Sequence, residues 1–406
     1  MRRASAISGK FAPCTHINSP YDSDPFLEVL IVKLSTSTAE LLAQLQTVSR
    51  VASTRSAVQA LSGVQIAAEG QGEGGGVELR ATDMEVGLRV PLQARIERPG
   101  LVVLPARLLL DVVRTLPHGD VSLELRPTEQ DVEIVGGTAR FHIRTLRTED
   151  FPPLPEPGGD QVVAMPAPAF VETIGRVSRS ASRDETRPVL TSIRVSATGD
   201  ELQMVATDSY RLCVKDTKLE HALDSETGFE ANVPARALDE LGRLVRDDVE
   251  DIRIGVRTNQ VVFEVGGIAL SSRLIDGQFP NPRQHLPAEY AHELRVSREE
   301  LLEVVRRISL MAQRNAPLRL TFSEGEVKVS AQTPDVGEAS ESLPVPFAGE
   351  PLEIGFNPEF FREGLESAES EELILKLISP LRPGLIQSGD EGSGFIYLVM
   401  PIRLNV

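Results

Sequence analysis

The chain has 406 residues and carries 42 Lys and Arg against 59 Asp and Glu, which gives a formal net charge of -17. This length predicts two to four domains of roughly 100 to 200 residues, and the acidic balance argues against a protein that simply coats nucleic acid with positive charge. No apolar run approaches the ~20 residues that span a bilayer, and no apolar segment typical of a secretory signal follows Met1. Neither of the two cysteines, Cys14 and Cys213, has a Cys or His nearby at ligand spacing. We therefore expect a cytoplasmic globular protein with no membrane partner, no metal and no cofactor.

Residues 1–31 lack clear periodicity, and the regular chain begins at Val32. From there a helix with one apolar stripe is predicted three times, at 38–53, 168–182 and 298–313. Each copy places apolar residues at positions i, i+4, i+7 and i+11, the spacing of a buried helix face. Ser37 and Ser297 are expected to cap the first and third copies.

A second set of elements repeats in the same order. Strands are predicted at 61–66, 190–195 and 317–322, and each is followed by a hairpin. The next strand ends in Ala-Thr-Asp at 81–83 and 206–208, with a drifted copy at 331–333. A second helix then opens with a proline, at Pro105, Pro234 and Pro358, because proline at the first helical position loses no hydrogen bond.

The repeat predicts an α+β fold of three similar domains, each with two helices packed on antiparallel sheets. We place the domains at 32–152, 160–283 and 290–406, after the irregular segment 1–31. Proline-rich stretches at 152–159 and 280–287 are predicted to link them.

No catalytic motif is found in the sequence: it has no nucleophile elbow, no phosphate-binding loop and no zinc-binding helix motif. The glycine-rich stretch 70–76 joins two predicted strands and is interpreted as a hairpin loop. Asp83 and Asp208 present two alternatives. They are a carboxylate pair for acid–base chemistry, or aspartates that hydrogen-bond their own backbone in a repeated turn. The duplication favours the turn.

Arginines recur on the outward faces of the predicted helices or just beyond them. They are Arg50, Arg55, Arg107, Arg114, Arg176, Arg179, Arg183, Arg236, Arg243, Arg307 and Arg314. For a single helix the simplest interpretation is an ordinary solvated face. Recurrence on most of the repeated helices favours a shared surface that contacts DNA phosphates without reading sequence.

Taken together, these features resemble the bacterial DNA sliding clamp family, the beta subunits of DNA polymerase III. The resemblance covers residues 32–406 and depends on the threefold repeat and on three motifs. These are Ala-Thr-Asp-x-x-Arg-Leu at 206–212, Asp-Gly-Gln-Phe-Pro at 276–280, and Val-Met-Pro-Ile-Arg-Leu at 399–404.

The resemblance implies a head-to-tail homodimeric ring that encircles double-stranded DNA, with helices around the hole and sheets outside. The arginines above would then line the hole. Phe141, Leu310 and Met311 match positions at the joint between the two chains.

The resemblance also implies a pocket for a short client peptide between the second and third domains. Its matching residues are Leu190, Thr207, Ser209, Tyr210, Arg211, Leu212, Pro280, Leu381, Pro383, Leu398, Met400, Pro401 and Arg403. The expected clients are the replicative polymerase catalytic subunit, the clamp loader, repair polymerases and mismatch-repair proteins.

Several positions depart from the family pattern. Ser209-Tyr210 stands where many relatives have Gly-His or Gly-Tyr, and Gln284 and His285 replace residues that are often basic and aliphatic. Asn405 and Val406 extend beyond the usual end. These differences bear on which peptides the pocket prefers.

Relatives begin with a short strand, and Val32-Lys33-Leu34 takes that place here. We therefore hypothesise that residue 32 is the true initiator, and that 1–31 is disordered if it is made. Three functions stay open: a non-enzymatic processivity factor, an enzyme built around Asp83 and Asp208, and a peptide-binding scaffold that never encircles DNA.

Overall fold

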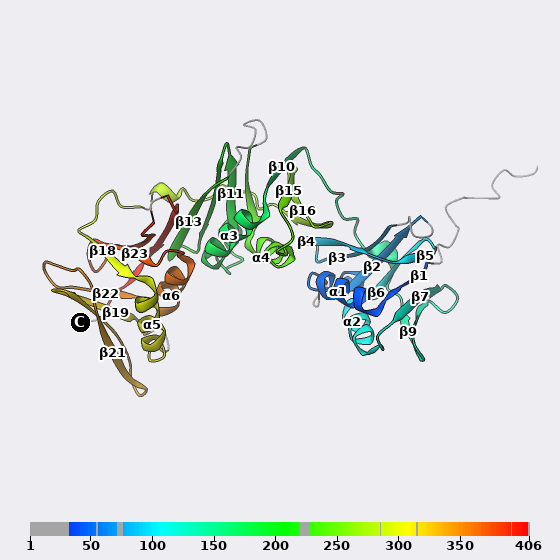
Figure 1. Ribbon diagram of the computed structural model, residues 1–406, viewed down its shortest axis with the longest axis horizontal. Helices are drawn as coiled ribbons and strands as arrows, with labels where there is room; N and C mark the ends of the chain where they lie inside the picture. The colour runs from blue at the N-terminus through cyan, green and yellow to red at the C-terminus, as the bar shows by residue number, and fades with distance from the viewer. Residues whose placement is uncertain are drawn as a thin grey trace, which may run out of the picture.

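The computed structural model describes residues 32–53, 56–70, 76–219, 228–284, 286–313, 316–390 and 392–404. These form three similar units that follow one another along an arch (Figure 1). The helices lie on the concave side of the arch, and the sheets form its outer layer. Predictions for 1–31, 71–75, Arg55, His285, Arg314, Asn405 and Val406 fall outside the described residues.

The first unit contains two helices, α1 (Thr38–Val48) and α2 (Ala106–Thr115). Its strands are β1 (Lys33–Ser37), β2 (Gly63–Glu69), β3 (Gly76–Thr82), β4 (Val86–Leu92), β5 (Arg95–Arg98), β6 (Gly100–Pro105), β7 (Asp120–Arg126), β8 (Asp131–Gly136) and β9 (Ala139–Arg144).

The second unit contains α3 (Ala167–Val177) and α4 (Ala235–Leu244). Its strands are β10 (Gln161–Pro166), β11 (Ser192–Thr198), β12 (Glu201–Thr207), β13 (Arg211–Lys218), β14 (Phe229–Pro234), β15 (Asp251–Val256), β16 (Gln260–Val265) and β17 (Ile268–Arg273).

The third unit contains α5 (Arg298–Ser309) and α6 (Pro358–Ser367). Its strands are β18 (His292–Ser297), β19 (Leu318–Ser323), β20 (Glu326–Thr333), β21 (Gly337–Pro344), β22 (Leu352–Phe356), β23 (Glu372–Leu377), β24 (Gly384–Ser388), β25 (Phe395–Val399) and β26 (Pro401–Ile402).

Two of the four sheets run across the unit boundaries. One eight-stranded sheet has the order β10-β15-β16-β17-β4-β3-β2-β6, and the other has the order β14-β11-β12-β13-β25-β24-β23-β18. Thus β17 pairs with β4 at the first junction, and β13 pairs with β25 at the second. The remaining sheets, β5-β1-β7-β8-β9 and β21-β20-β19-β22-β26, lie at the two ends of the arch.

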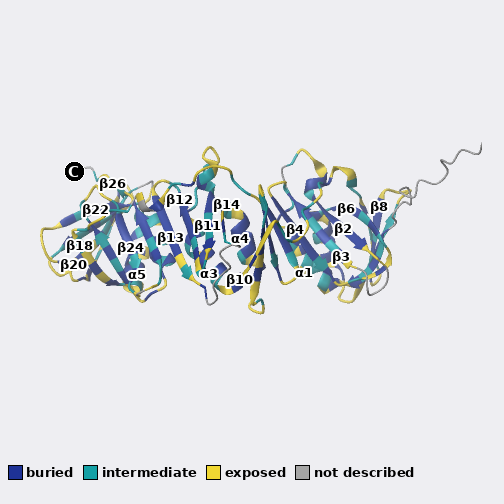
Figure 2. Ribbon diagram, turned by 90° about the horizontal axis from the view of Figure 1, so that it is seen from above, coloured by how far each residue is buried: buried dark blue, intermediate teal, exposed yellow. Residues whose placement is uncertain are grey.

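The fold predicted from the repeat is confirmed, since among the described residues the paired strands at both junctions and within the units are antiparallel and each unit carries two α-helices. Buried strands run through all three units, and exposed residues concentrate in the connections (Figure 2). The stripe leucines Leu41, Leu45 and Leu301 are almost fully buried. Because the apolar faces of helices and sheets meet between the layers, one core cluster extends through all three units.

The first helix of each unit is shorter than the periodicity predicts. α1 and α3 end at Val48 and Val177, and a short 3-10 turn follows α3. The last stripe residues, Ala52, Ala181 and Ala312, lie beyond the helix ends yet still pack partly against the core. A compact coil therefore preserves the apolar spacing without extending the helix.

The helix starts differ from the prediction in one respect. Ser37 Oγ accepts a hydrogen bond from the Glu40 backbone N–H, and Ser297 Oγ accepts one from Glu300, so both predicted caps are confirmed. Of the three prolines predicted to open the second helices, only Pro358 occupies the first turn of its helix. Pro105 and Pro234 are the last residues of β6 and β14 and precede α2 and α4. None of the described helices is long and apolar enough to cross a membrane.

Candidate functional site

The Ala-Thr-Asp element forms the same turn at both unit junctions. Asp83 Oδ1 accepts from the backbone N–H of Val86 at 2.9 Å, and Asp208 Oδ1 accepts from that of Arg211 at 3.0 Å. Met84 and Ser209 both adopt a φ of 80°. Each aspartate is thus used to build its own turn, at separate junctions, which supports the interpretation as turn formers over that as an acid–base pair.

Several arginines predicted to face DNA bind carboxylates across a unit junction. At the first junction Arg50 Nε lies 2.8 Å from Glu240 on α4, and Arg236 pairs with Asp83 at 2.5 Å. At the second junction Arg176 and Arg179 each lie 2.7 Å from a carboxylate of the third unit. These side chains therefore join neighbouring units, which the helix pattern alone could not indicate.

The partners at the second junction are Glu369, which lies just after α6, and Glu366, which lies within it. Burial raises the pKa of Glu366, but hydrogen bonds from Arg306 and Arg179 outweigh that effect and lower it. Arg306 binds Glu366 at 2.9 Å, so one carboxylate joins α5, α6 and the segment after α3.

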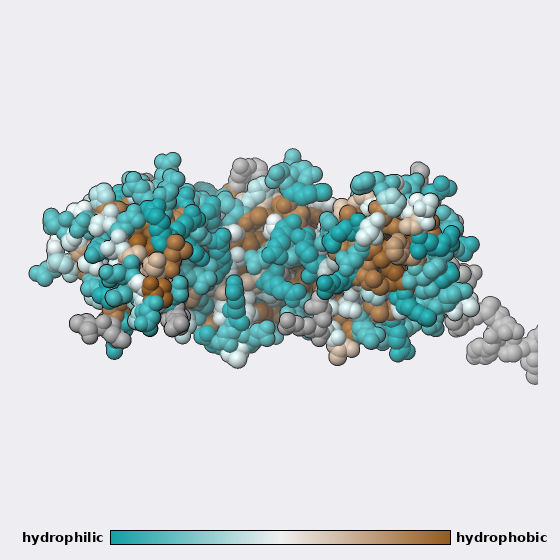
Figure 3. Space-filling model, turned by 90° about the horizontal axis from the view of Figure 1, so that it is seen from below, coloured by the Kyte–Doolittle hydropathy of each residue, from teal (hydrophilic) through white to brown (hydrophobic). Residues whose placement is uncertain are grey.

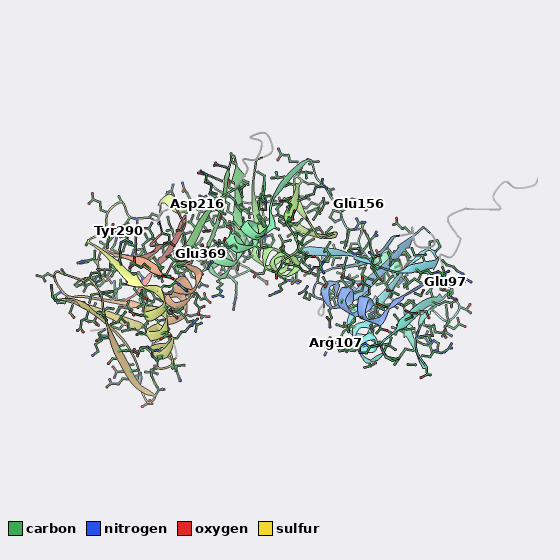
Figure 4. The ribbon with its side chains drawn as sticks, in the orientation of Figure 1. Glu97, Arg107, Glu156, Asp216, Tyr290 and Glu369 are labelled. Atoms are coloured by element: carbon green, nitrogen blue, oxygen red, sulfur yellow. The ribbon has the colours of Figure 1, made fainter. Side chains whose placement is uncertain are left out.

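The other predicted DNA-facing arginines that the structure describes are exposed. Arg114 and Arg243 pair with carboxylates on their own helices, at 3.4 and 2.9 Å, and Arg307 binds Glu341 at 2.8 Å. Within the described part of the chain, Arg107 and Arg183 make no ion pair. Arg107 lies on the concave side of the arch (Figure 4).

The outer face of the second junction carries an apolar surface. Leu212 on β13 pairs in register with Leu398 on β25, and Leu398 pairs with Leu385 on β24. These side chains form a cluster with Val205, Val214 and Phe279, separate from the main core. We call these residues the outer cluster. Val205, Val214, Phe279 and Leu385 were missed from the sequence, although the alternation of β12, β13 and β24 places Val205, Val214 and Leu385 on the same face.

Large apolar side chains stand exposed beside the outer cluster. The exposed fractions of Tyr210, Leu381 and Met400 are 61%, 60% and 41%. The Met400 backbone N–H donates to the Tyr210 carbonyl at 2.8 Å, which brings two of these residues from different units together. Leu190 is buried, whereas Pro280, Pro383 and Pro401 are partly exposed and Arg403 is exposed.

Arg211 points to the opposite face of β13 from Leu212. Its guanidinium binds Asp208 at 3.1 Å and contacts Glu363 on α6, and it lies over the Phe360 ring at 4.3 Å from the centroid. Its side chain is only 8% exposed. A ligand on the outer cluster would therefore meet Leu212 and not this guanidinium. A different guanidinium, that of Arg187, donates a hydrogen bond to the Ser209 hydroxyl at 3.0 Å.

Behind the apolar surface, four charged groups converge on the helix side of the second junction. Lys215 Nζ lies 3.4 Å from Glu369 and 3.9 Å from Glu172, and Arg176 contacts both carboxylates. A hydrogen bond with Glu369, together with burial, raises the pKa of Glu172. Glu369 lies on the side of the sheet that carries the helices (Figure 4).

The residues predicted at the joint between two chains lie in the first and third units. Phe141 is on β9 and packs partly against the core, and Leu310 and Met311 follow α5. Leu310 is 71% exposed, and Leu108 on α2, missed from the sequence, is 49% exposed. Figure 3, which looks into the open side of the arch, shows hydrophobic residues gathered over both the first and the third unit. The described residues hold no cluster of His, Cys, Asp and Glu that fits a metal ion.

Comparison with known proteins adds independent evidence. Family models for the N-terminal, central and C-terminal domains of the DNA polymerase III beta subunit match residues 32–155, 164–281 and 283–403. A beta sliding clamp from Synechococcus elongatus is 33% identical over 380 residues and spans 92% of this chain and 100% of the relative. One from Bacillus subtilis is 27% identical over 385 residues, with the same coverage of both chains.

Solved structures agree with these matches. The Bacillus subtilis sliding clamp superposes with a TM-score of 0.85 at 26% identity, covering 92% of this chain and 100% of that one. A Pseudomonas aeruginosa sliding clamp bound to griselimycin superposes with a TM-score of 0.82 at 28% identity and the same coverage. The repeated units, the continuous sheets and these matches together lead to one conclusion: the chain belongs to the DNA polymerase III beta subunit family, the beta sliding clamps.

Proposed function

We propose that two copies of this chain close head-to-tail into a ring that encircles duplex DNA and tethers a DNA polymerase to it. The observation that carries the proposal is that both internal junctions are built in the same way. Each end of the arch presents the strand and the helix of one side of such a junction, without the other side. In this proposal the domains keep the limits 32–152, 160–283 and 290–406.

The two internal junctions follow one rule. In the sheets, β4 of the first unit pairs with β17 of the second, and β13 of the second pairs with β25 of the third. The equivalent strand of the third unit is β21, and the strand of the first unit equivalent to β17 and β25 is β9. Both are edge strands in this chain. Exposed edges with unpaired backbone groups favour pairing with another strand, so β21 of one copy is expected to pair with β9 of the next.

The helices follow the same rule. The segment after α1 meets α4 through Arg50 and Glu240, and the segment after α3 meets α6 through Arg179 and Glu366. By analogy the segment after α5, which exposes Leu310, would meet α2 of the next copy, which exposes Leu108. Charge supports this arrangement, because β9 carries Arg140 and Arg144 whereas β21 carries Glu338 and Glu341. A head-to-tail contact forms a closed ring when its rotations add to a full turn.

The concave helices would face DNA. Retention by a closed ring is topological, so it needs no tight contact with phosphates. Arg107 and Arg183, together with the arginines that are ion-paired with carboxylates, would make weak contacts with phosphates. Because phosphates recur along the duplex, such contacts allow sliding. The net charge of -17 would discourage DNA from binding outside the ring.

The outer cluster and its exposed rim, Tyr210, Leu381 and Met400, would bind a short apolar segment of client proteins. Each buried Leu or Phe anchor contributes roughly 1.5–3 kcal/mol, and ordering and association costs offset much of this. The resulting exchangeable binding would serve the polymerase catalytic subunit, the clamp loader, repair polymerases and mismatch-repair proteins in turn. The chain itself would act in the cytoplasm without catalysis, and a separate ATP-driven loader would open it.

A loading assay tests the proposal. The purified chain is loaded onto nicked circular plasmid with a clamp loader and ATP, isolated by gel filtration, and the plasmid is then linearised. We expect the chain to stay on the circle and to leave after linearisation. A Leu310→Asp variant serves as the control with an opened joint. If the chain is not retained, or if linearisation does not release it, the ring proposal is wrong.

A further inference from the structure

A polar cavity adjoins the outer cluster on the same face of the sheet. It has a volume of about 480 Å³ and is lined by Arg194, Gln203, Asp216, Glu230 and Asn232 on β11–β14, with the linker residues from Gly277 to Pro282 as one wall. Val214, Phe279, Leu286 and Ile396 line the cavity and also belong to or pack on the outer cluster. The cavity and the proposed client site are therefore continuous.

The strand register relates the two sites to each other. One cross-strand row on this face contains Thr207, Leu212, Leu398 and Leu385, and is apolar after its first member. A parallel row contains Glu230, Ser196, Gln203 and Asp216, and is polar throughout. The rows are separated by four residues along β13, about 13 Å at ~3.3 Å per residue.

The polar row carries acceptors and negative charge. The side-chain amide of Gln203 donates through Nε2 to Asp216 Oδ1 at 2.7 Å. Its oxygen, Oε1, accepts a hydrogen bond from Arg194 at 2.5 Å. Arg194 is therefore directed to the amide and not to a carboxylate. Glu230 is exposed and makes no ion pair within the described part of the chain. Asp216 lies on the convex side of the arch, away from the helices (Figure 4).

The linker wall is held in place by the sheet. The Asn232 side-chain amide donates to the carbonyl oxygens of Ile275 and Gly277, at 3.2 and 2.9 Å. The cavity is thus a built feature between a rigid sheet and a tethered linker.

We propose that this cavity is a second subsite for the client segment, which takes a Lys or Arg side chain about four residues from the apolar anchor that sits on Leu212 and Leu398. The cation would pair with Asp216, with Glu230 at the other end of the polar row adding a longer-range attraction, and the extended backbone would follow β13. The inference rests on the proposed client site and assigns it a charge preference. The second subsite would select clients by a basic residue that lies outside their apolar anchor.

Binding of fluorescent synthetic peptides tests the subsite. Two pairs of peptides contain a Leu-Phe anchor. In one pair the residue four positions before the anchor is Lys or Gln, and in the other pair the residue four positions after it is Lys or Gln. At low ionic strength one Lys peptide should bind at least twofold and roughly threefold tighter than its Gln partner, the range expected for a partly exposed ion pair. The ratio should fall towards one at high salt.

Protein variants assign the effect to the cavity. Asp216→Asn keeps the acceptor for Gln203, and combined with Glu230→Gln it should bring the ratio of Lys-peptide to Gln-peptide affinity to one. Glu149→Gln, an exposed carboxylate of the first unit, is the matched control and should retain the preference. Thermal melting confirms that each variant is folded.

The outcomes separate the two proposals. Equal affinities of Lys and Gln peptides for the unmodified chain overturn the subsite, as does a preference for Lys that survives in the double variant. If neither peptide binds, the client site itself is wrong. If the Gln peptides bind and lose affinity on Leu212→Ser, the client site stands whatever the result for Lys.

Discussion

Arg211 is expected to hold the second and third units together, and replacing it by methionine tests this role. The change keeps most of the aliphatic stem and removes the guanidinium. That group contacts Asp208, Glu363 and the backbone carbonyl of Arg179, and it covers the Phe360 ring.

The magnitude follows from the burial of the partners. Removing one member of a buried ion pair costs about 3–5 kcal/mol because the other charge is left without compensation. The side chains of Asp208 and Glu363 are 13% and 17% exposed. Because solvent partly reaches them, we take the lower end of this range, about 3 kcal/mol. The lost contact with Phe360 adds about 0.5–1 kcal/mol. We expect Arg211→Met to lower the free energy of unfolding of this junction by about 3.5–4 kcal/mol.

Urea unfolding followed by far-UV circular dichroism measures the effect, since the chain contains no tryptophan. Arg187→Met is the matched control: it contacts the same turn through Ser209, but its side chain is 44% exposed and pairs locally with Asp184. An exposed pair contributes at most about 1 kcal/mol. If Arg211→Met costs no more than Arg187→Met, the guanidinium does not join the two units and the reasoning is refuted.

Three further predictions address the charges and the joint. Because the folded-state pKa of Glu172 is raised from 4.5, the stability linked to it is present below that value and lost as the pH rises through the folded pKa. Glu172→Gln, which mimics the protonated form beside Glu369, should therefore raise the melting temperature at pH above neutral but not near 4.5; an equal shift at both pH values would contradict this. Replacing both Arg107 and Arg183 by alanine should reduce the slope of log affinity against log salt for a short duplex by roughly two, and an unchanged slope would show that neither contacts phosphate. Leu310→Asp should weaken chain association at least tenfold, about 1.4 kcal/mol, in sedimentation equilibrium; unaltered association would place the joint elsewhere.

Local pattern was sufficient to predict the fold. The spacing of Leu41 and Leu45 and the caps Ser37 and Ser297 are short-range features, and a helix must bury its apolar stripe wherever it lies. Repetition of the pattern then predicted three units. The helix ends and the position of Pro105 were less predictable. A compact turn can bury the last apolar residue of a stripe as a helix does, and a proline can end a strand as well as begin a helix.

The charged residues of the site show what sequence could not supply. Arg50 and Arg107 both occupy outward positions, yet only Arg50 meets a carboxylate of the next unit, Glu240. That difference depends on how units abut, which no local spacing encodes. The orientation of Arg211 was accessible, because strand alternation opposes it to Leu212, whose apolar side chain belongs on the outer face.

Covalent closure of the proposed joint tests the central claim most directly. Leu108→Cys and Leu310→Cys are combined with Cys14→Ser, and a flexible bismaleimide joins the cysteines after loading onto circular plasmid. Cys213 is buried, and burial raises its pKa to about 12, which keeps it unreactive. We predict that crosslinked protein stays on the circle after denaturation in SDS and leaves when the plasmid is cut. Protein that SDS strips from the intact circle despite crosslinking would contradict encirclement.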